Sequence, residues 1–193
     1  MSKKLILVGG GARSGKSAFA LALGRQLGER RAFLATAQDL DAEMEARIAS
    51  HRRERGDEFV TLEEPLDVPG AVARVRLADV LVIDCLTLWI SNLLVRGDHA
   101  EDIAGEVRRL TEALAAQTFH AVLVTSEVGL GIVPESALGR AFRDAAGSAH
   151  QELASRAHRL YFAALGCVIR LKPAPLCLVD GPPGGEIAQE SAR

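Results

Sequence analysis

The chain has 193 residues, of which 48% are hydrophobic and 25% charged, and its formal net charge is −2. This composition excludes a disordered or fibrous chain, and the length suits one domain with a sizeable core better than two. The slight negative charge argues against a nucleic acid or an anionic membrane as partner, so we expect small-molecule partners.

Neither the start of the chain nor its longest apolar stretch has the pattern of an exported or membrane-anchored protein. The start, MSKKLILVGGG, has only four apolar residues before the glycines, too few for a signal peptide. The stretch VLVIDCLTLWISNLLV contains Asp84 and is too short and polar to span a bilayer. Cys85, Cys167 and Cys177 are widely spaced and form no metal-ligand pattern. We therefore expect a reduced, cytoplasmic protein without a membrane anchor.

Predicted strands alternate with predicted helices along the chain. The candidate strands are residues 5–8, 32–35, 59–62, 80–83, 121–125 and 168–171. This alternation is typical of βαβ units and predicts an α/β fold with a mostly parallel central sheet. The runs LILV, VLVI and AVLVT are apolar throughout, which indicates central strands that are covered on both faces.

Apolar residues at helical spacing lie between these strands. One set follows the first strand, a second precedes the fifth, and a third forms a long amphipathic segment after Pro134. The three sets are Phe19, Leu23 and Leu27; Ile103, Val107, Leu110 and Leu114; and Leu138, Phe142, Ala149, Leu153 and Leu160. We expect one nucleotide-binding domain over residues 1–172 and a Pro- and Gly-rich tail over 173–193 outside the core.

The segment GGARSGKS, residues 10–17, matches the phosphate-binding loop GxxxxGK[ST]. Glycines let backbone N–H groups converge on phosphate oxygens, and the following helix presents its positive end to them. A glycine turn with an incidental lysine is the alternative, but the strand–loop–helix context favours the phosphate loop. We predict that Lys16 neutralises the β- and γ-phosphates and that Ser17 is a ligand of Mg²⁺. The predicted nucleotide-binding residues of the loop are Gly10, Gly11, Ala12, Arg13, Ser14, Gly15, Lys16 and Ser17.

Asp84 ends the predicted buried strand VLVID. An acidic residue at a strand end is often a cap or turn residue. Beside a phosphate loop, however, it is typical of the carboxylate that orders the magnesium shell. We predict an Mg²⁺ site at Ser17 and Asp84, which indicates a nucleoside triphosphate but leaves the acceptor open.

The charged segment DAEMEARIASHRRERG predicts a helix on which Glu43, Arg47, His51 and Arg55 form one column. A neutral imidazole between arginines could attack a phosphate while the arginines hold the charge of the transferred group. The same spacing also fits a solvated, salt-bridged helix face. The remaining histidines, which we expect to be structural, are His99, His120, His150 and His158.

Four segments, GGARSGKS, ARIASHRRERGDEFVTLEEP, VIDCLTLWISNLL and EVGLGIVPESALGRAFRDAAG, occur in this order. Together they closely resemble the bifunctional adenosylcobinamide kinase and adenosylcobinamide-phosphate guanylyltransferase family of cobalamin assembly, and the resemblance extends to about Lys172. It implies a three-layer P-loop NTPase fold of the RecA-like type and two reactions. ATP or GTP phosphorylates the aminopropanol hydroxyl of adenosylcobinamide. A histidine then attacks the α-phosphate of GTP, pyrophosphate leaves, and GMP passes to the cobinamide phosphate, giving adenosylcobinamide-GDP.

The resemblance also assigns site residues. The guanylylated histidine of the family lies in an RI..H pattern, which here is Arg47, Ile48 and His51. Further nucleotide-site residues implied by the family are Arg52, Arg53, Glu54, Arg55 and Glu63, with Ala35, Thr36 and Ala37 after the second strand. The resemblance also implies a trimeric assembly with sites near the subunit interfaces. We therefore expect a homo-oligomer whose small-molecule partners are adenosylcobinamide and its phosphate.

The chain departs from the family pattern at three positions. Phe59 stands where relatives usually have Trp, and Ser126 and His150 stand where they have Asn. Phe59 keeps an aromatic ring, whereas Ser126 and His150 alter the polar groups expected on the cobinamide side of the site.

Two other functions fit the phosphate loop. One is a plain kinase of another small alcohol, with His51 as a surface residue. The other is a nucleotide-operated module of the RecA type. The slight negative charge and the few aromatic residues argue against the second, since DNA-binding modules present basic grooves and stacking aromatic side chains.

Overall fold

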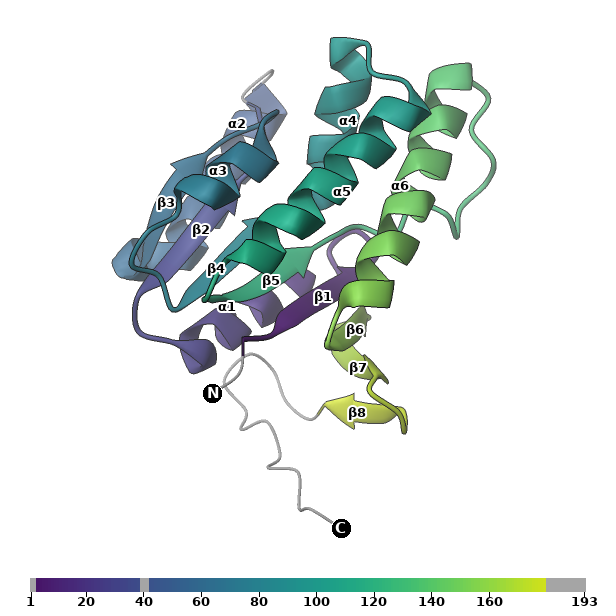
Figure 1. Ribbon diagram of the computed structural model, residues 1–193. Coiled ribbons are helices and arrows are strands. Elements are labelled where there is room, and N and C mark those ends of the chain that lie inside the picture. The colour runs from purple at the N-terminus through teal and green to yellow at the C-terminus, as the bar shows by residue number, and fades with distance from the viewer. Residues whose placement is uncertain (1–2, 39–41, 180–193) are drawn as a thin grey trace.

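The computed structural model describes residues 3–38 and 42–179 (Figure 1). The strands in these residues are β1 (Leu5–Gly10), β2 (Arg31–Ala35), β3 (Phe59–Glu63), β4 (Val80–Asp84), β5 (His120–Val124), β6 (Arg159–Ala164), β7 (Cys167–Lys172) and β8 (Cys177–Val179). The helices are α1 (Lys16–Leu27), α2 (Ala42–Arg55), α3 (Val68–Arg74), α4 (Leu86–Arg96), α5 (Ala100–Ala116) and α6 (Ala137–Arg156), with the short 3-10 turn η1 (Gly56–Glu58).

The eight strands of the described residues form one sheet in the order β3-β2-β4-β5-β1-β6-β7-β8. The pairs from β3 across to β6 are parallel, and β7 and β8 add an antiparallel edge. β5 lies between β1, which leads into the phosphate loop, and β4, which ends at Asp84. In a parallel sheet ligands bind beyond the carboxyl ends of the strands, so the loop and Asp84 meet at one edge.

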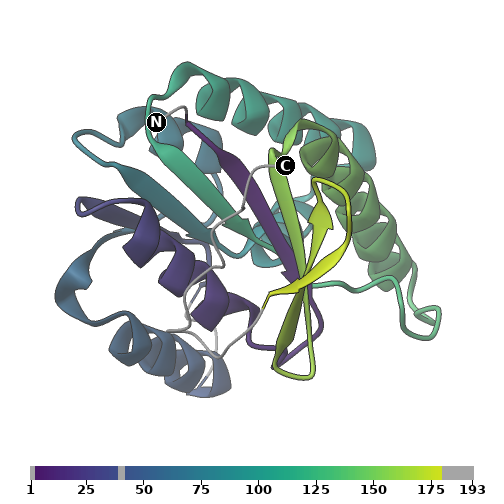
Figure 2. The same cartoon turned by 90° about the horizontal axis from the view of Figure 1, so that it is seen from below.

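Helices cover both faces of the sheet, giving three layers (Figures 1 and 2). Leu81 and Ile83 of β4 pack in the apolar cluster that contains α3, α4, α5 and α6. Val80 and Val82 of the same strand pack in the cluster that contains α1. Successive side chains point to opposite faces, so a strand covered on both must be apolar throughout. This arrangement confirms the predicted central position of β1, β4 and β5.

Local chemistry sets several helix ends. Asp67 begins α3 and accepts a hydrogen bond from the backbone N–H of Gly70 at 3.1 Å. Ser136 begins α6 in the same way, accepting from Gly139 N at 3.1 Å. Gly97 ends α4 in the left-handed region, with φ of 108°. A side-chain oxygen at the N-terminal cap accepts a hydrogen bond from an unpaired backbone N–H of the first turn. A glycine after the last residue adopts the left-handed conformation that ends the helix.

The predicted helix after Pro134 is too long at its end. Helix α6 stops at Arg156, and Leu160 lies in β6, where it pairs with Leu7 of β1. Leu153 and Leu160 are seven residues apart, a spacing that also fits one face of a helix. The apolar pattern therefore did not distinguish the start of β6 from a continuation of the helix. At the other end Leu138 is exposed rather than part of the buried stripe.

Part of the tail that we expected outside the core extends the sheet. Residues 177–179 form β8, which pairs antiparallel with β7. Residues 180–193 lie outside the described residues, and the domain limits at 172 and 173 stay a prediction. Across residues 3–38 and 42–179, no helix is both long and apolar enough to cross a membrane.

Candidate active site

The phosphate loop joins β1 to α1 and has the geometry of an anion site. A Cβ on Gly10 would lie 2.4 Å from the carbonyl oxygen of Ala163, and Gly15 has a φ of 91°, so both positions require glycine. The ammonium of Lys16 lies against the loop and donates a hydrogen bond to Gly11 O at 3.0 Å. Ser14 Oγ is buried and has no hydrogen-bond partner among the described residues. An unpaired buried hydroxyl beside a lysine is the donor set that a bound phosphate would complete.

Asp84 faces this loop from the end of β4. Burial raises the pKa of its carboxyl, while a hydrogen bond from Ser17 and the charges of His51, Lys16 and Arg55 lower it. The Ser17 hydroxyl and the Asp84 carboxylate are oxygen ligands of the kind that Mg²⁺ prefers. No group of three or more His, Cys, Asp or Glu side chains in the described residues could hold a metal ion. The two residues therefore fit a cation whose remaining ligands are phosphate oxygens and water.

A cavity of about 870 Å³ lies between the phosphate loop, α2 and the carboxyl edge of the sheet. One chain therefore supplies both the loop and the helix that carries His51. The predicted site residues that line it are Arg13, Ser14, Gly15, Lys16, Ser17, Ala35, Ala37, His51, Arg52, Glu54, Arg55, Glu63 and Asp84. The predicted residues that do not line it are Gly10, Gly11, Ala12, Thr36 and Arg53.

His51 projects from α2 with 46% of its side chain exposed. Its Nδ1 lies 3.6 Å from Glu54 Oε2, a carboxylate outside the predicted column. Arg52 pairs instead with Glu63 of β3. The side chains of Glu43 and Arg47 lie outside the described residues. A carboxylate at Nδ1 orients an imidazole and leaves Nε2 available as the nucleophile.

Arg55 is a buried cation of the cavity, with 6% of its surface exposed. Its guanidinium lies 4.1 Å from the centre of the Phe33 ring, which packs edge-on against Phe59. Burial and the charge of Arg52 lower the pKa of Arg55, and the charges of Asp84 and Glu63 oppose this. Within the described part of the chain no carboxylate forms an ion pair with it. An arginine held by stacking keeps its N–H donors for a phosphate.

Thr36, directly after β2, is hydrogen-bonded to residues of the neighbouring elements. Its buried hydroxyl donates to Cys85 O at 2.7 Å and accepts from Cys85 N at 2.9 Å. The amide of Asn92 donates to Thr36 O at 2.8 Å. These bonds tie the end of β2 to the start of α4, directly after Asp84. The hydroxyl is thus already hydrogen-bonded within the chain, and the assignment of Thr36 to the nucleotide site stays a prediction.

Apart from Ser126, which the family resemblance assigned to the cobinamide side, the wall of the cavity away from the phosphate loop was not predicted from the sequence. Its residues come from the first turns of α4, the end of β5 and α6, namely Thr87, Leu88, Ser91, Ser126 and Phe142. The available signal was position: the first turn of a helix after a strand end faces the carboxyl edge of the sheet.

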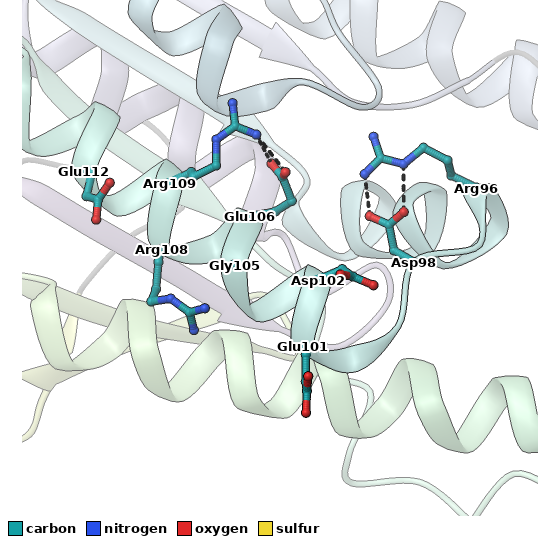
Figure 3. A pocket seen from close by; sticks show the side chains of 9 residues that line it. All are labelled: Arg96, Asp98, Glu101, Asp102, Gly105, Glu106, Arg108, Arg109 and Glu112. Carbon is teal, nitrogen blue, oxygen red and sulfur yellow. Dashed lines mark hydrogen bonds and ion pairs between the residues drawn. The ribbon is translucent and has the colours of Figure 1, made fainter.

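A second hollow, of about 560 Å³, lies beside the connection between α4 and α5 and along α5 (Figure 3). Its lining is charged except for Gly105. Arg96 Nε donates to Asp98 at 2.9 Å, and Arg109 donates to Glu106 at 2.7 and 2.9 Å. These pairs are exposed surface ion pairs, which are common on helices, and we assign no ligand to this hollow.

The Asp84→Asn variant is expected to be more stable than the parent at pH 7 and much less active. Because the folded protein raises the pKa of this carboxyl, stability falls as pH rises from the unfolded pKa through the folded one. Asparagine removes the buried charge, and therefore also the loss of stability that this charge causes at pH 7. It also removes a ligand expected of Mg²⁺, so we expect phosphoryl transfer to fall by roughly 10²-fold or more.

Thermal unfolding checks the first effect: the midpoint should rise at pH 7, and the difference should shrink as the pH is lowered. A variant that is less stable than the parent at pH 7 would contradict the assignment of Asp84 as a buried, unfavourable charge.

The chain is similar over most of its length to proteins of one family. The family model described as cobinamide kinase / cobinamide phosphate guanyltransferase matches residues 6–171. The bifunctional adenosylcobalamin biosynthesis protein CobP of Pseudomonas aeruginosa is 42% identical over 171 residues, 88% of this chain and 98% of that protein. The bifunctional adenosylcobalamin biosynthesis protein CobU of Escherichia coli is 38% identical over 183 residues, 87% of this chain and 99% of that protein.

Solved structures with the same fold are more distant. The RadB recombinase is 16% identical with a TM-score of 0.50, covering 88% of this chain and 80% of that one. The flagellar accessory protein FlaH of Methanocaldococcus jannaschii is 14% identical with a TM-score of 0.50, covering 95% and 82%. These likenesses show the fold alone, and they confirm the predicted RecA-like P-loop architecture.

Proposed function

Because the chain belongs to the cobinamide kinase / cobinamide phosphate guanyltransferase family, we propose that it catalyses both reactions on adenosylcobinamide. In the first, the aminopropanol hydroxyl oxygen attacks the γ-phosphorus of ATP or GTP, the bond to the β–γ bridging oxygen breaks, and the hydroxyl proton leaves. The products are adenosylcobinamide phosphate and a nucleoside diphosphate.

In the second reaction, His51 Nε2 attacks the α-phosphorus of GTP and the α–β phosphoanhydride bond breaks, releasing pyrophosphate. A phosphate oxygen of adenosylcobinamide phosphate then attacks the same phosphorus, and the P–N bond to His51 breaks. The product is adenosylcobinamide-GDP, and the histidine is restored. Splitting one transfer into two steps is the general advantage of a covalent intermediate.

The observation that carries this proposal is the placement of His51 and Lys16 on the same cavity of one chain. Lys16 would hold the terminal phosphates of a triphosphate, and His51, Arg52 and Arg55 of α2 line the same cavity, where the α-phosphate would also lie. The arginines supply positive charge where the transferred phosphate gains negative charge. The plain-kinase alternative, in contrast, gives His51 no role in this cavity.

We propose Mg²⁺ as the metal ion, held by Ser17 and Asp84. When bound it would supply Lewis-acid neutralisation of the phosphate oxygens. Lys16 and Arg55 add fixed positive charge on the same cavity, and the Ser17 hydroxyl already hydrogen-bonds the Asp84 carboxylate. The cavity thus places cationic groups beside the carboxylate that would hold the ion.

We propose a homo-oligomer, a trimer by family resemblance. The support is an exposed apolar stretch in the loop between β5 and α6 and the first turn of α6, where Leu130, Ile132, Val133 and Leu138 are each more than half exposed. Clustered apolar side chains of this kind are typical of protein contacts. Sedimentation equilibrium should give about three times the chain mass, and a monomer at micromolar concentration would contradict the proposal.

We propose a cytoplasmic location, because Cys85 and Cys167 are free thiols and because nucleoside triphosphates are the proposed substrates. We propose no nucleic-acid partner, since the likeness to the RadB recombinase extends to the fold alone.

The test is conversion of adenosylcobinamide, followed by chromatography. With ATP or GTP and Mg²⁺ the chain should form adenosylcobinamide phosphate, and with GTP it should continue to adenosylcobinamide-GDP. A reaction that stops at the phosphate would identify a plain kinase. No phosphorylation at all would refute the kinase half, and a second sample supplied with adenosylcobinamide phosphate and GTP would then test guanylyl transfer by itself.

A further inference from the structure

Ser126 lies within a connected set of polar side chains at the cavity wall away from the phosphate loop. Thr125 Oγ1 lies 2.6 Å from His150 Nε2 and 3.3 Å from Thr87 Oγ1. The backbone N–H of Ser126 donates to Thr87 Oγ1 at 2.6 Å. Glu127 completes the set, with its Oε2 4.0 Å from His150 Nδ1. We call Thr87, Thr125, Glu127 and His150 the Ser126 clamp.

The hydrogen bonds of the clamp run in one direction. The Glu127 carboxylate faces Nδ1 of His150, which favours the proton on Nδ1 and leaves Nε2 to accept from the Thr125 hydroxyl. Thr125 Oγ1 can then accept from the hydroxyl of Thr87, whose own oxygen accepts from Ser126 N–H. Burial lowers the pKa of His150, and only Glu127 opposes this, so the imidazole is neutral at pH 7.

The side chain of Thr87 also has Cys85 as a neighbour. Burial raises the pKa of Cys85 to about 11, and its sulfur hydrogen-bonds Thr87. Cys85 is therefore a thiol at neutral pH, although the hydrogen bond with Thr87 partly offsets the effect of burial on its pKa.

The backbone fixes the same segment from the other side. Thr125 N donates to Val8 O at 3.0 Å, and Glu127 N donates to Gly10 O at 2.9 Å. Ser126 therefore sits between two residues that are tied to β1 and to the first glycine of the phosphate loop. Its side chain lines the cavity together with Thr87 and Phe142. The loop and α2 occupy the nucleotide side, so this wall is left for the acceptor.

We propose that Ser126 contacts the acceptor and that His150, acting through Thr125 and Thr87, is the residue that positions it. This inference rests on the proposed function, since it assigns one wall of the cavity to adenosylcobinamide. Ser126 is then a specificity-determining residue of the kinase step, and His150 is a positioning residue that does not touch the substrate.

The test is steady-state kinetics of the phosphorylation of adenosylcobinamide by GTP. Ser126→Ala and His150→Leu should each raise the KM for adenosylcobinamide about tenfold, while the KM for GTP stays within about twofold. The double variant should show about the same tenfold effect, because both changes remove one contact. His150→Gln should recover most of the loss, since its amide oxygen can accept from Thr125.

An unchanged KM for adenosylcobinamide in Ser126→Ala would overturn the contact. Independent effects that multiply to about a hundredfold in the double variant would overturn the link to His150. Equal rises of both KM values would indicate a general disturbance and would also overturn the proposal.

If His150→Leu does not fold, ¹⁵N NMR of the parent protein decides the role of His150. A proton on Nδ1 with an accepting Nε2 supports the clamp, and a proton on Nε2 contradicts it. A parent protein inactive on adenosylcobinamide would refute the kinase half of the proposed function and the inference with it. An active parent with an unaffected Ser126→Ala variant would refute the inference alone.

Discussion

The Lys16→Ala variant is expected to lose both phosphorylation of adenosylcobinamide and guanylyl transfer, each by roughly 10³-fold or more. Lys16 is buried at the start of α1 and its ammonium lies over the phosphate loop, 3.0 Å from Gly11 O. A single cavity implies that one lysine holds the terminal phosphates of the nucleotide in both reactions. Initial rates of the two conversions, measured separately, check this expectation.

Lys16→Met is the matched control, because methionine keeps most of the side-chain length without the charge. Both variants should fold, with a thermal midpoint close to that of the parent, and both should be equally inactive. Loss of the kinase step alone would mean that guanylyl transfer uses a different nucleotide site. Nucleotide binding without either transfer in the parent protein would favour the RecA-type module instead.

The His51→Ala variant is expected to separate the two activities. Phosphorylation of adenosylcobinamide should remain within about threefold of the parent, because Lys16, Ser17 and Asp84 are unchanged, whereas guanylyl transfer should fall by roughly 10⁴-fold or more. Adenosylcobinamide phosphate should accumulate. Chromatography of the cobinamide products over time measures both effects in one reaction.

His99→Ala is the matched control for this change, since His99 begins α5 and does not line the cavity. It should keep both activities. Continued formation of adenosylcobinamide-GDP by His51→Ala would contradict the covalent mechanism. Equal loss of both reactions would assign His51 to nucleotide binding in general.

The sequence predicted the centre of the sheet and the nucleotide side of the site, because both have local signals. The apolar runs of β1, β4 and β5 follow directly from burial on two faces. The phosphate loop is contiguous, and Asp84 ends a strand of the same pattern. Strand β6 was assigned to the preceding helix because its role depends on pairing with β1, about 150 residues away, rather than on its own spacing.

The wall of the cavity away from the phosphate loop had no such signal. Thr87, Ser126 and His150 come from three elements and are brought together by the order of β4, β5 and β1 in the sheet. The structure thus places Ser126 and His150, the two positions where the sequence analysis expects a changed polar group, in one hydrogen-bonded group. In contrast, Thr36 belongs to a stretch implied for nucleotide binding, yet its hydroxyl is engaged by Cys85.

Labelling with GTP most directly tests the proposal that His51 carries the guanylyl group. The parent protein is incubated with Mg²⁺ and GTP labelled at the α-phosphate, without acceptor, and a parallel sample receives GTP labelled at the γ-phosphate. We expect an acid-labile, alkali-stable label from the α-phosphate alone, mapped to His51 and absent from His51→Ala. A folded parent protein that takes up no label, or a label that persists in His51→Ala, would contradict it.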